Sequence, residues 1–194
     1  MFLIFLILIV VIVVLAVILL TQQGQSASVP AKPPSSPAER TLFDLQLGDI
    51  VQHEGTDWVV EGQLTYDEAG FQWYEYLLQD GDRRRWLAVE EDDWVDVQLL
   101  EPLTSLDISA NPPQELTVND RVYRLVGSGT ARMTRKGRLD RPNAETCRFY
   151  DYDGPDNKVL SVEDWNGDIE VSVGDRINPQ SLTILPGDGQ SVYR

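Results

Sequence analysis

The sequence predicts an all-β fold of two tandem five-stranded meanders, forming small barrels or a joint sandwich, preceded by one transmembrane helix. Residues 71–97 alternate apolar and polar side chains with a period of two, which places one face of a strand on a core. A similar segment returns at 149–173, and residues 1–20 form an unbroken apolar run. These three observations predict a duplicated β domain behind a membrane anchor.

The apolar run at 1–20 would span about 30 Å as a helix, which is the thickness of the hydrocarbon core of a bilayer. A cleaved signal peptide usually begins with a basic segment and has a shorter apolar core. No Lys or Arg precedes this run. We therefore expect an uncleaved anchor that contacts the membrane through residues 2–20. A cleaved signal peptide and a buried core helix are the alternatives.

The basic residues nearest to the run are Lys32 and Arg40, and both follow it. The positive-inside tendency then predicts a single-pass protein of the inner (plasma) membrane whose C-terminal domain is cytoplasmic. Residues 21–40 are rich in Pro, Ser, Gln and Ala and contain almost no large apolar side chain. Such a composition cannot form a core, so this stretch is expected to be a disordered linker.

The first β repeat is expected at 41–103. Gly62 interrupts a strand pattern at 58–66 and predicts a bulge or sharp bend there. The dipeptide Asp80-Gly81 tolerates a positive φ and predicts the turn of a hairpin. Aromatic and β-branched residues on both sides of these turns favour strands.

The second β repeat is expected at 116–185, after a proline-containing connection at 104–115 and before a tail at 186–194. Its hairpin signal Asp153-Gly154 echoes Asp80-Gly81 of the first repeat. Residues 160–163 echo residues 87–90 at the same offset. Self-similarity at one constant offset indicates two copies of one unit.

Two motifs of the first repeat resemble the bacterial domain-of-unknown-function family 4178. They are Leu47-Gly48-Asp49-Ile50-Val51 and Trp58-Val59-Val60-Glu61-Gly62. The resemblance covers most of residues 45–177. The second copy departs from it, because Gly127-Ser128-Gly129-Thr130 replaces the tryptophan-containing strand. The resemblance implies no catalytic residues, since the family is uncharacterised. It implies a genomic neighbourhood of polyamine-synthesis enzymes and membrane-stress proteins.

The charge balance limits the partners. The chain has 31 Asp plus Glu against 16 Lys plus Arg, a net charge of −15. Nucleic-acid binding needs a positive surface, so a nucleic-acid partner is not expected. The lone Cys147 allows no intramolecular disulfide, and the lone His53 lies in a polar loop signal. No nucleophile elbow, phosphate loop or paired-histidine motif occurs, so we expect neither an enzyme nor a cofactor.

The acidic groups at 90–93 and at Asp151, Asp153 and Asp156 could suggest a metal site, but turns and a solvated surface explain them more simply. Tryptophans on the outer face of a sheet either pack on the neighbouring copy or form a binding surface. The candidate partner or ligand surface consists of Trp58, Trp73, Trp86, Trp94, Glu90 and Glu91.

Together these features predict a membrane-anchored, non-catalytic binding or scaffolding module for an unknown protein partner, with a link to membrane stress. The alternative is a small-ligand domain that binds a polyamine on an acidic, tryptophan-bearing surface through charge and cation–π contacts.

Overall fold

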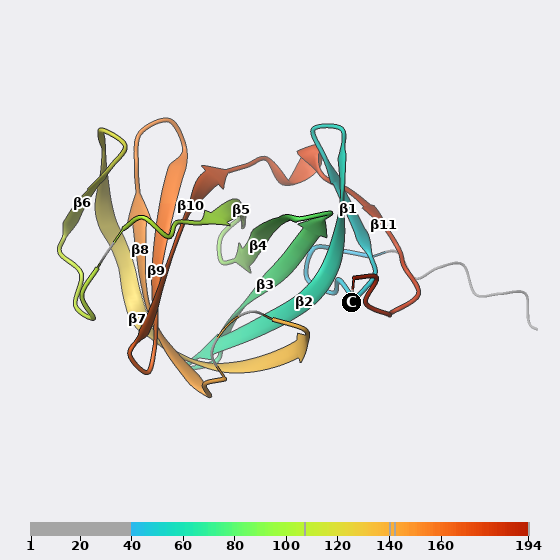
Figure 1. The fold of residues 1–194 in the computed structure, drawn as a ribbon, viewed down its shortest axis with the longest axis horizontal. Coiled ribbons are helices and arrows are strands. Elements are labelled where there is room, and N and C mark those ends of the chain that lie inside the picture. Colours follow the sequence, from blue (N-terminus) through green and yellow to red (C-terminus); the bar gives the residue numbers. More distant parts are fainter. Residues whose placement is uncertain (1–39, 107, 140, 142, 194) are drawn as a thin grey trace, which may run out of the picture. The chain divides into compact units, whose positions relative to one another are not determined.

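The computed structural model describes residues 40–106, 108–139, 141 and 143–193. This part of the chain holds eleven strands and one short 3-10 helix, η1 (Pro179–Ser181) (Figure 1). The strands of the first repeat are β1 (Ile50–His53), β2 (Thr56–Glu68), β3 (Phe71–Asp80), β4 (Arg83–Glu91) and β5 (Val95–Pro102). Those of the second repeat are β6 (Glu115–Val118), β7 (Arg121–Gly137), β8 (Thr146–Asp153), β9 (Lys158–Trp165) and β10 (Asp168–Arg176), and β11 (Thr183–Leu185) follows.

All described strands belong to one antiparallel sheet in the order β11-β1-β2-β3-β4-β5-β10-β9-β8-β7-β6. The two repeats meet where β5 pairs with β10, and they meet again where the second half of β2 pairs with β7 (Figure 1). The strands β2 to β5 and β7 to β10 therefore close into one eight-stranded barrel, and β1, β6 and β11 extend the sheet beyond the ring.

The all-β prediction is confirmed, but the predicted small barrels or joint sandwich are wrong, because the two meanders share one barrel. The reason lies in the long strands β2 and β7. Each is interrupted by a register shift, at Val60/Gly62 in β2 and at Leu125/Gly127 in β7. One half of each strand pairs with the first strand of its own repeat, and the other half pairs across to the other repeat.

The predicted transmembrane helix at 1–20 lies outside the described residues, as does nearly all of the linker predicted at 21–40. Within the described part, no helix is long and apolar enough to cross a membrane. The fold class with a preceding helix is therefore corrected, and so are the single-pass and inner-membrane predictions that depended on it. The described chain forms strands because its apolar residues recur at every second position, and no long apolar run follows residue 20.

Alternation gives the strands of the barrel two buried faces. In β4, Leu87 and Val89 join an apolar cluster made only of first-repeat residues and flanking segments. Trp86 and Ala88 point to the other face, into a cluster that both repeats build. Tyr152 and Val162 lie in a third cluster, which belongs to the second repeat. The shared face is the barrel interior, and it carries the polar residues described next.

The C-terminal segment returns to the first repeat. β11 pairs with β1, and the buried carboxylate of Glu61 accepts hydrogen bonds from the backbone N–H groups of Val192 (2.8 Å) and Tyr193 (3.1 Å). Asp49 accepts another from the N–H of Gly187 at 2.7 Å. Two buried carboxylates therefore hold the segment that the sequence predicted to be a tail.

Candidate functional site

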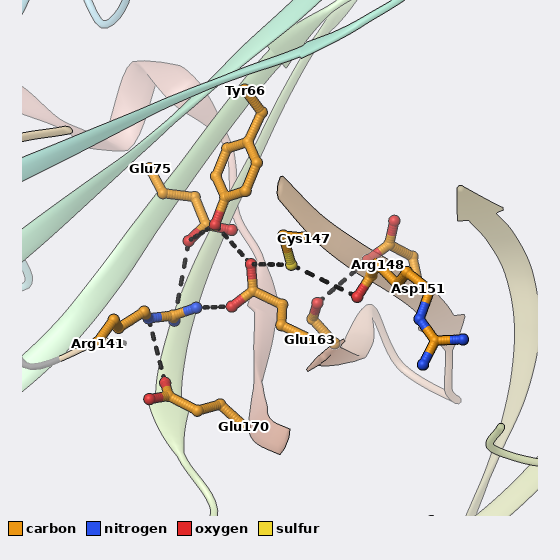
Figure 2. A network of polar contacts seen from close by, with 9 residues as sticks. Tyr66, Glu75, Arg141, Cys147, Arg148, Asp151, Glu163 and Glu170 are labelled. Atoms are coloured by element: carbon orange, nitrogen blue, oxygen red, sulfur yellow. Dashed lines mark hydrogen bonds and ion pairs between the residues drawn. The ribbon is translucent and has the colours of Figure 1, made fainter. Parts of the chain in front are cut away.

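A buried guanidinium lies in the barrel interior. Arg141 comes from the connection between β7 and β8, and its guanidinium carbon lies 4.1 Å from the ring centroid of Trp86 and 5.3 Å from that of Trp165. It forms ion pairs with three carboxylates, Glu75, Glu163 and Glu170 (Figure 2). We call these two rings and three carboxylates the guanidinium cage.

Strand alternation places the carboxylates of the cage. Glu75 in β3 lies two residues after Trp73, and Glu163 in β9 lies two residues before Trp165, so each carboxylate shares the interior face with a tryptophan. The hydroxyl of Tyr66 in β2 donates a hydrogen bond to Glu163 at 2.5 Å, and its oxygen lies 3.4 Å from the carboxylate of Glu75 (Figure 2). The cage thus joins strands of both repeats.

Burial governs the protonation of this network. Desolvation raises the pKa of Glu75, and the nearby Arg141 guanidinium opposes the rise. Desolvation also raises the pKa of Glu170, again opposed by Arg141. For the Cys147 thiol, burial raises the pKa to about 12, with a further contribution from the charge of Glu75. The thiol is therefore protonated at neutral pH, which does not suit a nucleophile.

A cavity of about 320 Å³ adjoins this network and shares Glu75 with it. We call it the acidic cavity. Its carboxylates are Glu68, Glu75, Glu90, Asp96, Asp151 and Asp153, and its aromatic rings are Phe71, Trp73, Phe149 and Tyr152. Among the described residues, Arg176 is its one cationic side chain. Both repeats contribute to the wall, so the cavity exists only because the barrel closes.

The acidic cavity holds more negative than positive charge. Arg176 pairs with Asp96 at 2.8 Å and with Asp153 at 3.1 Å. Burial raises the pKa of Asp151 to about 7, opposed by a hydrogen bond from Ser161 and reinforced by the charge of Glu90. Burial likewise raises the pKa of Glu90, and the neighbouring Asp96 adds to the rise. A cation in this cavity would relieve both effects.

Aromatic rings form another part of the cavity wall. Trp73 stacks on Tyr66 with centroids 4.9 Å apart and meets Phe149 edge-on at 5.1 Å. Gly129 leaves room for this arrangement, because a Cβ there would lie 2.8 Å from Phe149. At Gly127 a Cβ would lie 3.7 Å from the Asp151 carboxylate. The glycines that depart from the tryptophan-containing pattern of the first copy therefore leave space in and beside the cavity.

The structure separates the six residues of the predicted surface. Trp73 and Glu90 come together in the wall of the acidic cavity, and Trp86 lies in the guanidinium cage. Trp58 is buried in the first-repeat cluster, where the guanidinium carbons of Arg83 and Arg85 each lie 5.1 Å from its ring centroid. Trp94 is 71% exposed, and Glu91 is exposed as well.

The acidic groups also divide between the cavity and the surface. Asp151 and Asp153 line the cavity, whereas Asp156 is exposed in the turn after β8 with a φ of 56°. Among the described residues, no group of three or more His, Cys, Asp or Glu side chains is arranged to hold a metal ion.

Glu75, Glu163, Arg141 and the role of Gly127 were not predicted from the sequence. Strand periodicity assigns one face to the core and leaves the other to solvent, and here both faces are buried. One signal was available: Glu75 and Glu163 each lie two residues from a tryptophan, which puts a carboxylate and an indole on one face. Nothing in the local pattern identifies Arg141, because its position depends on barrel closure.

Comparisons with known proteins agree with the resemblance seen in the motifs. A family model described as "Domain of unknown function (DUF4178)" matches residues 46–179. Uncharacterised proteins of Mycobacterium tuberculosis (strain H37Rv) and Mycobacterium bovis are each 30% identical over 146 residues, which is 72% of this chain and 70% of the relative. An uncharacterised protein of Aquifex aeolicus is 26% identical over 163 residues, 78% of this chain and 86% of the relative. No solved structure matches the chain.

Proposed function

The chain belongs to the DUF4178 family, whose description assigns no activity, and we propose that its barrel binds a small organic cation of the amine class, such as a polyamine, in the acidic cavity. One observation supports this most strongly. In the part of the chain that the structure describes, six carboxylates and one guanidinium line a cavity of about 320 Å³ that also has an aromatic wall. Ligand sites for small molecules begin at about this size, at roughly 300 Å³.

Charge supplies the first part of the recognition. Arg176 pairs with both Asp96 and Asp153, and two other carboxylates of the wall, Glu90 and Asp151, have raised pKa values. An ammonium group near them would favour their charged forms and would itself be held in a partly desolvated setting, where charge pairs are stronger than in water.

The aromatic wall supplies the second part. Trp73 is half-buried, lines the cavity and is fixed by its stacking on Tyr66. An indole face attracts an ammonium group by about 0.5 to 2 kcal/mol, and the methylene chain of a polyamine gains from apolar burial beside it. The combination favours an alkylamine over a bare metal cation.

The test is a titration of the full chain with putrescine and with spermidine at moderate salt. Binding is measured by calorimetry and by tryptophan fluorescence. We expect saturable binding that weakens by roughly tenfold in Glu90→Gln and in Asp151→Asn, in keeping with the loss of one charge contact. Glu91→Gln is the matched control, because this carboxylate is exposed beside Glu90. Absence of saturable binding, or equal loss in the control, would reject the proposal.

The scaffolding function for a protein partner stays a prediction. Of the six surface residues named for it, Trp94 and Glu91 are exposed, and they lie together at the turn between β4 and β5. A single exposed indole is a small patch compared with the area that a stable protein interface buries, so the acidic cavity carries the stronger proposal.

A further inference from the structure

The interior holds a second arrangement suited to a cation, next to the acidic cavity and already filled. We propose that the guanidinium cage formed by Trp86, Trp165, Glu75, Glu163 and Glu170 is a binding site for alkylguanidinium groups, which the chain occupies with its own Arg141. This inference does not rest on amine binding in the acidic cavity.

The cage surrounds the guanidinium with aromatic rings and carboxylates. The guanidinium carbon of Arg141 lies within reach of two indole rings, at 4.1 Å from Trp86 and 5.3 Å from Trp165. Carboxylates meet its nitrogens at different positions, with Glu163 and Glu75 at the terminal nitrogens and Glu170 3.2 Å from Nε. A planar cation with donors along its rim fits such a site better than a compact ammonium group does.

The strands of the barrel hold the backbone of every residue in the wall of the cage. Trp86 is on β4, Glu75 on β3, and the other three members are on β9 and β10. All of these are strands of the closed barrel. Arg141 instead enters from the connection between β7 and β8. Removing its side chain would therefore leave the walls held by the sheet.

Two further observations indicate a ligand site. A second cavity, of about 450 Å³, is lined by Trp86, Arg141 and Glu170, by the polar side chains of Arg84 and Thr104, and by apolar side chains, so the cage borders space on that side. The indole N–H of Trp165 is buried and has no hydrogen-bond acceptor among the described residues. Arg141 carries only donors and cannot supply that acceptor. A guanidino compound that also carries an oxygen acceptor could satisfy it.

The experiment is chemical rescue. Arg141→Ala leaves two buried carboxylates, Glu75 and Glu163, and the partly exposed Glu170 without their cation. It is expected to lower the Tm strongly, because the buried charges have lost their partner. Millimolar methylguanidinium should then raise the Tm of this variant saturably, by roughly 5 °C or more. Methylammonium at the same ionic strength should raise it much less. The wild-type chain, whose cage is filled, should show no such shift.

Arg138→Ala is the matched control, because this arginine is exposed a few residues earlier in the same connection. It should show neither the loss nor the rescue. If Arg141→Ala does not fold without additive, the double variant Arg141→Ala/Glu163→Gln reduces the uncompensated charge and is tested in the same way. The proposal is overturned if methylguanidinium stabilises neither variant more than it stabilises the wild type, or if methylammonium serves equally well.

The two proposals can fail separately. Amine binding is measured in the wild-type chain through Glu90 and Asp151, which are not members of the cage. Guanidinium rescue is measured in the Arg141 variants as a thermal shift and needs neither of those carboxylates. If no amine binding is detected but methylguanidinium rescues the Arg141 variants, only the proposal for the guanidinium cage stands. If amines bind but methylguanidinium gives no rescue, only the proposal for the acidic cavity stands.

Discussion

Gly62 of β2 lies directly opposite Gly137 of β7, at the end of the pairing that closes the barrel. Gly137 has a φ of +76°, a conformation that favours glycine, and a Cβ there would lie 2.7 Å from the side chain of Leu47. At Gly62 a Cβ would lie 2.9 Å from the carbonyl oxygen of Arg138. The two repeats therefore approach each other closely here because neither residue has a side chain.

Gly137→Ala should destabilise the barrel through both backbone strain and crowding. We expect a loss of about 2 to 4 kcal/mol in the free energy of unfolding, measured by denaturant titration. Gly70→Ala is the matched control, since Gly70 also has a positive φ of 96° but has open space around its Cβ position. It should lose only about 1 kcal/mol. Equal losses would show that the close contact at Gly137 contributes nothing.

Asp151 should make stability depend on pH. Its pKa is raised from 3.8 to about 7 by burial, so between these values the folded chain binds a proton that the unfolded chain releases. The free energy of unfolding contributed by this group should therefore fall as pH rises from about 4 to about 7. Asp151→Asn should remove this slope and gain stability relative to the wild type at pH 8.5.

Denaturant titrations at pH 5.5 and pH 8.5 measure this effect, with the exposed Asp156→Asn as control. A wild-type slope that Asp151→Asn leaves unchanged would assign the titration to another carboxylate. Bound amine should also reduce the difference between the two pH values, because a cation beside Asp151 favours its charged form.

The sequence predicted the repeated hairpins and the bend at Gly62 correctly, because local turn chemistry and alternation decide both. It did not predict the closed barrel, which depends on the pairing of β2 with β7 between residues that lie 65 to 75 positions apart in the sequence. Each half of these strands carries an ordinary strand pattern, and no local signal states which partner it will take. The same limitation applies to the site, because strand alternation alone does not show that the face with Glu75 and Glu163 is buried.

The Cys147 thiol should react very slowly in the folded chain. It is 1% exposed, and burial raises its pKa from 9.0 to about 12. At pH 8 the fraction of thiolate should therefore be roughly a thousandfold lower than in the unfolded chain. A disulfide reagent such as DTNB measures the rate, with the chain in denaturant as the reference. Rapid labelling of the native chain would mean that the barrel interior near Glu163 opens readily.

A large side chain at position 127 should fill part of the acidic cavity and abolish amine binding without removing a charge. Gly127 lies at the register shift in β7, lines the cavity and has no positive φ, so a side chain is tolerated by the backbone there. A Cβ would lie at ordinary contact distance, 3.7 Å from the Asp151 carboxylate. Gly127→Ala should therefore bind nearly as the wild type does, and Gly127→Leu should place its branched end in the space that the ligand needs.

We expect Gly127→Leu to weaken putrescine binding by at least roughly a hundredfold, since an excluded ligand loses its contacts with both carboxylates and indole. Calorimetry gives the affinity, and circular dichroism with a thermal scan confirms that the variant is folded. Ser128→Leu is the matched control, because the next residue along the strand is exposed and faces away from the cavity. Undiminished binding in a folded Gly127→Leu would place the amine elsewhere, because the leucine side chain takes up the part of the cavity beside Asp151.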